Sequence, residues 1–268
     1  MSLNKLTISE ANKQLKNGDI TSEQLTRACL DAIKEKDGEI RACLNVCEEE
    51  AIEAAREADE RREKGEDNPL LGIPFLAKDN IMTKGVKTTA ASKILEDYTA
   101  PFDATVIAEL KEKGAVLLGK TNLDEFAHGV STENSAFQVT RNPQDTSRVP
   151  GGSSGGSAAG VASDMCLFAL GTDTGGSVRH PASFCGVTGL KPTYGRSSRF
   201  GLIAMTSSTD VPGPLTKTTE DASLVLSELA GKDDQDPTTV DKEVPRYAEE
   251  MSEDISGMRI GLPRQYFE

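Results

Sequence analysis

A chain of 268 residues is close to the upper limit for one hydrophobic core, so we expect a single large domain. Its net charge of −13 excludes a self-sufficient basic surface for DNA or RNA, because phosphate binding needs clustered lysine and arginine. The first residues lack the apolar stretch of a signal peptide, and no run approaches the length that spans a membrane. We therefore expect a cytoplasmic protein without a membrane partner.

The five cysteines lack the short spacing of zinc ligands, and only two histidines are present to complete such a site. The cysteines are Cys29, Cys43, Cys47, Cys166 and Cys185. Their pattern favours buried free thiols in a reducing compartment, and we expect no metal in this chain.

The first quarter of the chain carries two helix signals. Thr21 and Gln24 form a capping box ahead of an apolar helical pattern. The alanine-rich, charged segment Glu48–Lys64 predicts a second helix that stops at Gly65. We expect residues 1–66 to supply N-terminal helices that cover one side of the core, and residues 67–268 to form the main core of the same domain.

From Pro69 onward, short apolar runs alternate with helical patterns. The apolar runs are Leu70–Ala77, Gly114–Leu118, Cys166–Leu170 and Met258–Leu262, and the helical patterns are Asp103–Lys113, Ser157–Ser163 and Thr219–Ala230. Strands that alternate with helices predict an α/β fold whose sheet is covered on both faces.

Two segments rich in glycine and serine interrupt this pattern, Pro150–Ser157 and Gly171–Ser177. The first has the composition of a linker, but it leads directly into the small-residue stretch Ala158–Ala162, which needs close packing. We therefore expect a helix N-terminus inside the core, with N–H groups that face a negative group. The second segment follows an expected strand, and its paired glycines let backbone N–H groups converge as an oxyanion hole requires.

Two other motif matches are set aside. Gly114–Thr121 fits the P-loop pattern, but its middle residues are apolar and are expected to be a strand. Gly152-x-Ser154-x-Gly156 fits the nucleophile elbow of α/β-hydrolases, which requires a later acid and then a histidine. The only later histidine, His180, follows too soon to complete that series. A serine nucleophile in this chain therefore needs a different base.

Lysine acts as a base when burial or a neighbouring cation lowers its pKa toward neutrality. Most of the basic residues in such a chain are solvated surface charges. Lys78 differs because it directly follows the apolar run Leu70–Ala77 and precedes Asp79 and Asn80. It is the candidate base.

Four segments together resemble the amidase signature family, in the same order along the chain. They are Ala77–Asn80, Pro150–Ser157, Gly171–Ser177 and Cys185–Thr193. Three more are similar to one branch, the A subunits of glutamyl-/aspartyl-tRNA amidotransferases; these are Thr121–Phe126, Ser131–Ser135 and Tyr194–Arg196. The resemblance begins near Leu6 and reaches the last residues. It implies a mixed sheet, with residues 67–268 as the catalytic core, and a C-terminal portion still to come because the family's chains continue well past Glu268.

The resemblance also implies a role for each matched site residue. Lys78 is the base, Ser153 relays the proton, in the family often across a cis peptide bond, and Ser177 is the nucleophile. The implied oxyanion donors are backbone N–H groups at Thr174, Gly175, Gly176 and Ser177.

The implied chemistry is the release of ammonia from the side-chain amide of glutamine. In the resembling complex, ammonia passes to a partner that uses ATP and magnesium to amidate mischarged Glu-tRNA(Gln) or Asp-tRNA(Asn). Subunits B and C, and tRNA through the complex, are therefore the expected partners, and this chain itself is expected to need no cofactor. Two alternatives stay open, a free-standing amidase that acts on other small amides and an inactive fragment.

Three positions depart from that branch. His128 stands where methionine is usual, Val130 where serine is usual and His180 where glutamine is usual. His128 and Gly129 are candidates for the substrate pocket, although a structural histidine is the favoured interpretation of His128. His180 lies three residues after Ser177, and a Ser–His pair there is the weaker alternative to the lysine base.

Overall fold

The computed structural model describes residues 2–251 and 254–266. Within these residues, six strands form one mixed sheet in the order β1-β3-β2-β4-β6-β5. The strands are β1 (Cys43–Val46), β2 (Pro74–Lys78), β3 (Val116–Thr121), β4 (Phe168–Asp173), β5 (Thr188–Gly189) and β6 (Val211–Thr216). β2 is parallel to both of its neighbours, β3 and β4, whereas the remaining pairs are antiparallel. The predicted α/β class and mixed sheet are confirmed.

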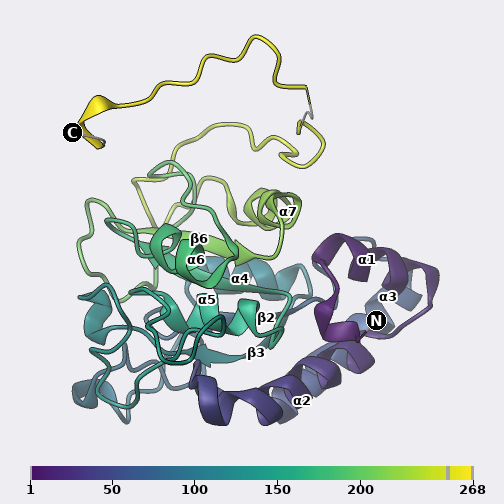
Figure 1. Ribbon diagram of the computed structural model, residues 1–268. Helices are drawn as coiled ribbons and strands as arrows, with labels where there is room; N and C mark the ends of the chain where they lie inside the picture. The colour runs from purple at the N-terminus through teal and green to yellow at the C-terminus, as the bar shows by residue number, and fades with distance from the viewer. Residues whose placement is uncertain (1, 252–253, 267–268) are drawn as a thin grey trace.

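Helices cover both faces of the sheet, as predicted. They are α1 (Ile8–Asn17), α2 (Ser22–Ile40), α3 (Glu48–Glu63), α4 (Thr105–Glu112), α5 (Gly155–Ala162), α6 (Arg179–Cys185) and α7 (Thr219–Leu229). Four single turns of 3-10 helix are η1 (Leu3–Lys5), η2 (Lys93–Leu95), η3 (Glu125–Ala127) and η4 (Arg264–Tyr266). Figure 1 shows α2 along the β3 side of the sheet and α7 along the β6 side, and both helices contact those strands.

The N-terminal helices begin and end where the sequence signals lie. At α2 the Thr21 hydroxyl accepts the N–H of Gln24, and the Gln24 side chain accepts the N–H of Thr21, so two free donors of the first turn are satisfied. α3 ends just before Gly65, whose φ of 92° lies in the left-handed region that favours glycine. Both predicted helices are confirmed.

The centre of the core lies around β2 and β4, whose residues are all buried. Phe75 of β2 and Phe168 of β4 are paired in the ladder and their rings stack with centroids 5.1 Å apart. α5 contacts four of the strands and is buried along Gly155–Val161, which small residues permit. The segment with the P-loop pattern forms β3, as expected, and its Lys120 is buried within the sheet.

The predicted strand at Met258–Leu262 is wrong. This segment has no strand partner among the described residues, and Met258, Ile260 and Leu262 are exposed. Figure 1 shows this yellow segment lying apart from the sheet. Apolar residues stabilise a strand only where a neighbouring edge accepts its hydrogen bonds and a core covers its side chains.

The five cysteines are buried as free thiols, and burial raises the pKa of each. They are therefore poor nucleophiles. Among the described residues, none of the helices combines the length and apolar character needed to cross a bilayer.

Candidate active site

The carboxyl ends of β2 and β4 lie side by side because the two strands are parallel neighbours. β2 ends at Lys78, and β4 ends at Asp173, four residues before Ser177. Ser153 reaches the same edge of the sheet from the loop that precedes α5. The fold therefore brings the three predicted residues into one region, at the place where α/β sheets usually hold their ligands.

Lys78 is fully buried, and its Nζ lies 2.7 Å from Ser153 Oγ. The same nitrogen lies 2.9 Å from Oγ1 and 3.3 Å from the carbonyl oxygen of Thr172. Burial lowers the pKa of Lys78 to about 7, and attraction to three buried carboxylates keeps it from falling further. A large fraction of this amine is neutral at physiological pH, which a general base requires.

The glycine-serine loop is the N-terminus of a buried helix, as predicted. α5 begins at Gly155, and the peptide bond between Gly152 and Ser153 is cis, as the family resemblance implied. Ser154 joins the two loops, because its N–H donates to the Ser177 carbonyl at 3.1 Å and its hydroxyl donates to the Thr172 carbonyl at 3.2 Å. Ser153 is fully buried, whereas Ser177, the predicted nucleophile, is 8% exposed and is the more open of the two serines.

The turn that carries Ser177 is organised around the Asp173 carboxylate. Asp173 accepts the N–H groups of Gly176 at 2.7 Å and Val178 at 3.1 Å, and it forms an ion pair of 3.0 Å with Arg179. Although burial raises the pKa of Asp173, the bonds from Arg179 and the backbone outweigh it and hold this pKa below the ordinary value. The charged carboxylate therefore anchors both sides of Ser177.

The expected oxyanion donors are unequally available. The Gly176 N–H already donates to Asp173. The N–H groups of Thr174, Gly175 and Ser177 have no hydrogen-bond partner in the part of the chain that the structure describes. These three groups can therefore turn toward a developing negative charge without breaking an existing bond.

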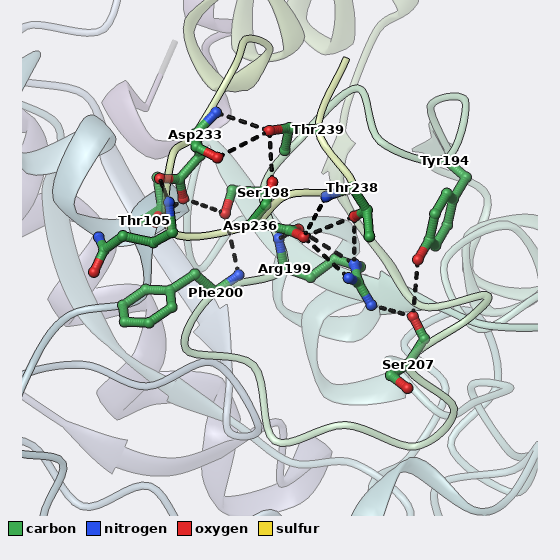
Figure 2. Close-up of polar contacts among 11 residues, drawn as sticks. Thr105, Tyr194, Ser198, Arg199, Phe200, Ser207, Asp233, Asp236, Thr238 and Thr239 are labelled. Atoms are coloured by element: carbon green, nitrogen blue, oxygen red, sulfur yellow. Dashed lines mark hydrogen bonds and ion pairs between the residues drawn. The ribbon is translucent and has the colours of Figure 1, made fainter. Parts of the chain in front are cut away.

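The Thr174 hydroxyl donates to Asp210, which also accepts the N–H groups of Met205 and Thr206 at 2.9 and 3.2 Å. This loop is held from outside by Arg199, which donates to the Ser207 carbonyl and pairs with Asp236 at 3.0 Å. Figure 2 shows Arg199 between Asp236 and Ser207, with Thr238 beside it. The network fixes the loop that positions Thr174.

Among the described residues, neither of the predicted pocket residues, His128 and Gly129, forms a hydrogen bond with the Lys78 side chain. His128 is exposed, and its Nδ1 lies 2.9 Å from the Phe126 carbonyl oxygen. Gly129 packs directly on Asp124, since a Cβ added to it would lie 2.3 Å from the Asp124 carboxyl carbon. Asp124 in turn accepts the N–H of Thr132 at 3.0 Å.

His180 contacts the loop before α5 that carries Ser153, and its side chain makes no hydrogen bond to Ser177 among the described residues. Its Nδ1 lies 3.4 Å from both the N–H and the carbonyl oxygen of Gly152. Its ring packs on Phe184 with centroids 4.3 Å apart. This arrangement favours the lysine over the histidine as partner of the serines.

Sequence reasoning missed the residues that surround the base. Thr172 lies inside one of the two glycine-rich segments, but its contact with Lys78 spans 94 positions of the chain. Asp124 lies in a matched segment without an assigned role, and Asp210 carries no local signal at all. The only available hint was a threonine and an aspartate at the end of a buried strand, where ligand sites form.

Comparison with known proteins identifies the family. The amidase family model matches residues 24–268. The A subunit of the glutamyl-tRNA(Gln) amidotransferase from Desulfatibacillum aliphaticivorans is 56% identical over 268 residues, which is 100% of this chain and 55% of that protein. The chain thus spans about half the length of the curated relatives it matches.

Solved structures agree with this comparison. The A subunit of the glutamyl-tRNA(Gln) amidotransferase from Thermotoga maritima is 46% identical with a TM-score of 0.79, over 91% of this chain and 50% of that one. The peptide amidase of Stenotrophomonas maltophilia is 38% identical with a TM-score of 0.85, over 91% of this chain and 52% of that one. Sequence and fold lead to the same conclusion: the chain belongs to the amidase family.

Proposed function

We propose that this chain is a glutamine-hydrolysing amidase subunit that supplies ammonia to a tRNA-dependent amidotransferase. The observation that carries the proposal is the buried contact of 2.7 Å between Lys78 Nζ and Ser153 Oγ, beside the turn of Ser177. The 56% identity to the A subunit of an amidotransferase supports glutamine as the amide donor.

In the proposed reaction, neutral Lys78 takes a proton from Ser153 while Ser153 takes one from Ser177. Ser177 Oγ then forms a bond to the side-chain carbonyl carbon of glutamine, and the carbonyl oxygen becomes an oxyanion. The N–H groups of Thr174, Gly175 and Ser177 are its proposed donors. When the C–N bond breaks, the proton returns through Ser153 to the leaving nitrogen, which departs as ammonia.

Water then attacks the γ-glutamyl ester by the same relay and releases glutamate, which restores the free serine. We place His128 and Gly129 at the border of the substrate pocket, on the side of Asp124. The chain itself is proposed to need no metal or cofactor for these steps, because each proton has a donor and an acceptor within the trio.

The wider assignment follows from the same resemblance. Subunits B and C are the proposed partners of a cytoplasmic heterotrimer, in which a partner subunit holds ATP, magnesium and mischarged tRNA. The net charge of −13 is consistent with tRNA binding elsewhere in the complex. Residues 1–66 are proposed to be the helical cover and residues 67–268 the catalytic core of one domain.

The decisive test is the site of the covalent intermediate. The intact protein, with its partners, is quenched in acid during glutamine turnover and its peptides are analysed by mass spectrometry. We expect a γ-glutamyl adduct on Ser177. The variant Ser177→Ala should lose both the adduct and the release of ammonia. The control Ser207→Ala, at an exposed serine, keeps both. An adduct on any other residue, or ammonia release that survives Ser177→Ala, contradicts the proposal.

A second candidate is a free-standing amidase, favoured by the TM-score of 0.85 to a peptide amidase. It predicts release of ammonia from varied amides without partner subunits, whereas the leading proposal predicts glutamine hydrolysis that rises with partners and mischarged tRNA. An inactive fragment predicts that a serine-reactive fluorophosphonate leaves Ser177 unlabelled under either condition.

A further inference from the structure

The contacts of the Lys78 amine are unequally divided between its two neighbours. Ser153 supplies one oxygen atom, at 2.7 Å, whereas Thr172 supplies both its hydroxyl oxygen at 2.9 Å and its carbonyl oxygen at 3.3 Å. Lys78 and Ser153 are fully buried and Thr172 is 2% exposed, so these contacts are shielded from bulk water.

The number of oxygens matters when the amine accepts a proton. An ammonium group has three N–H donors and no acceptor, and an unsatisfied donor on a buried charge is costly. The three oxygens around Nζ match its three donors one to one. Two of them belong to Thr172, so this residue supplies two of the three hydrogen-bond acceptors of the protonated base.

The Thr172 hydroxyl is itself held in place. Asn80 Nδ2 lies 3.1 Å from Thr172 Oγ1 and 3.3 Å from the Ile203 carbonyl oxygen, and two such acceptors identify the atom between them as the amide nitrogen. The Thr172 backbone is fixed independently, because it pairs with Pro212 in the ladder between β4 and β6.

We propose that Thr172 is a positioning residue of the proton relay, whose hydroxyl and carbonyl hold the Lys78 ammonium in line with Ser153 at the moment of proton transfer. The inference rests on the relay proposed above and deepens it. The carboxylates of Asp124, Asp173 and Asp210 also face this amine and favour its charge. They form no hydrogen bond to Nζ among the described residues, so Thr172 acts by contact and the carboxylates act through their field.

The test compares two substitutions at one position. Thr172→Val removes the hydroxyl and keeps the branched shape, whereas Thr172→Ser keeps the hydroxyl. Thr216→Val is the control, because Thr216 is also fully buried in the sheet and its hydroxyl donates to the Thr218 carbonyl, away from Lys78. The readout is the rate at which a fluorophosphonate labels Ser177 in the intact protein, from acidic to alkaline pH, with circular dichroism to confirm folding.

We expect Thr172→Val to lower the maximal labelling rate by about 10- to 100-fold, a part of what a general base contributes. The acid limb of its pH profile, where the labelling rate rises as Lys78 loses its proton, shifts to lower pH than in the unsubstituted protein. The reason is that removal of the hydroxyl takes a hydrogen-bond acceptor from the ammonium form and destabilises that form more than the neutral amine. Thr172→Ser restores both the rate and the limb, and Thr216→Val leaves both unchanged. A purely structural role for Thr172 lowers the rate without moving the limb.

The inference is overturned if Thr172→Val labels as fast as the unsubstituted protein, if its limb stays in place, or if Thr172→Ser does not rescue it. Failure of the proposed function looks different. If the unsubstituted protein is labelled at Ser177 but releases no ammonia from glutamine, the substrate assignment falls and the role of Thr172 stands. If Ser177 is not labelled at all, the relay and this inference fall together.

Discussion

Lys120 Nζ lies 3.3 Å from Asp79 Oδ1, with both side chains sealed from solvent next to Lys78. Lys120 also donates to the Ile81 carbonyl at 2.6 Å, and Asp79 accepts the N–H of Thr89 at 2.8 Å. The pair thus ties β3 to the turn that follows β2. Because Asp79 directly follows Lys78 in the chain, the pair fixes the backbone next to the candidate base.

Removing one partner of this pair leaves the other charge buried and uncompensated. We expect Lys120→Met to lower the free energy of unfolding by about 3–5 kcal/mol, measured by urea denaturation. The control is Lys93→Met, which breaks an exposed pair with Glu96 and should change stability by no more than about 1 kcal/mol. Equal losses in the two variants would show that Asp79 and Lys120 do not depend on each other.

The pKa of about 7 for Lys78 predicts a pH dependence of Ser177 reactivity. The base acts in its neutral form, so the labelling rate should rise as pH increases through about 7 and level off above it. Fluorophosphonate labelling over pH measures this limb without any substrate. A limb near the ordinary lysine value of 10.5 would mean that the amine is solvated.

Glu109 on α4 predicts that the fold becomes less stable as pH rises. Burial, helped by the nearby charge of Asp233, raises the pKa of Glu109 from 4.5 to about 7. Its folded state therefore binds a proton more tightly than its unfolded state, and this stabilisation is lost as pH rises through about 7. Glu109→Gln should be more stable than the unsubstituted protein above that pH and similar below 4.5, by thermal melting. The exposed neighbour Glu112→Gln should show no such difference.

Gly156 in α5 lies so close to the backbone of other segments that there is no room for a larger side chain. A Cβ at this position would lie 2.5 Å from the Asn122 carbonyl oxygen and 2.6 Å from that of Ala42. Gly156→Ala should therefore cost about 1–3 kcal/mol of stability, because backbone must move. Gly38→Ala, in α2 with nothing within 4 Å, should instead gain about 0.4–1 kcal/mol. The same sign for both substitutions in urea denaturation would contradict this contrast.

Arg199 holds the loop whose Asp210 positions Thr174 (Figure 2). Its side chain is 17% exposed and that of Asp236 is 4% exposed. We expect Arg199→Gln to cost about 1–3 kcal/mol and to speed hydrogen exchange in residues 202–210. Arg148→Gln, which breaks an exposed pair with Asp145, should do neither. Unchanged hydrogen exchange in Arg199→Gln would show that Arg199 does not stabilise this loop.

Much of the fold could be predicted from the sequence because its signals are local. Capping at Thr21 needs only a residue three positions away, and the buried strand before Lys78 is an uninterrupted apolar run. The roles of Lys78, Ser153 and Ser177 were implied by the resemblance to the amidase signature family, which rests on short motifs. The signals for these elements and motifs lie within a few positions of one another, so they can be recognised from the order of residues alone.

Only the tertiary structure decided what surrounds these residues. The contact between Lys78 and Ser153 spans 75 positions, and it depends on α5 packing against β2 and β4. The parallel pairing of β2 with β4 delivers Thr172 to the amine, and long-range packing supplies Asp210. An apolar run such as Met258–Leu262 has the sequence pattern of a strand, but it forms a strand only where it can pair with the edge of a sheet. Local sequence encodes each element, whereas burial, register and the resulting pKa of a lysine arise only when distant segments pack together.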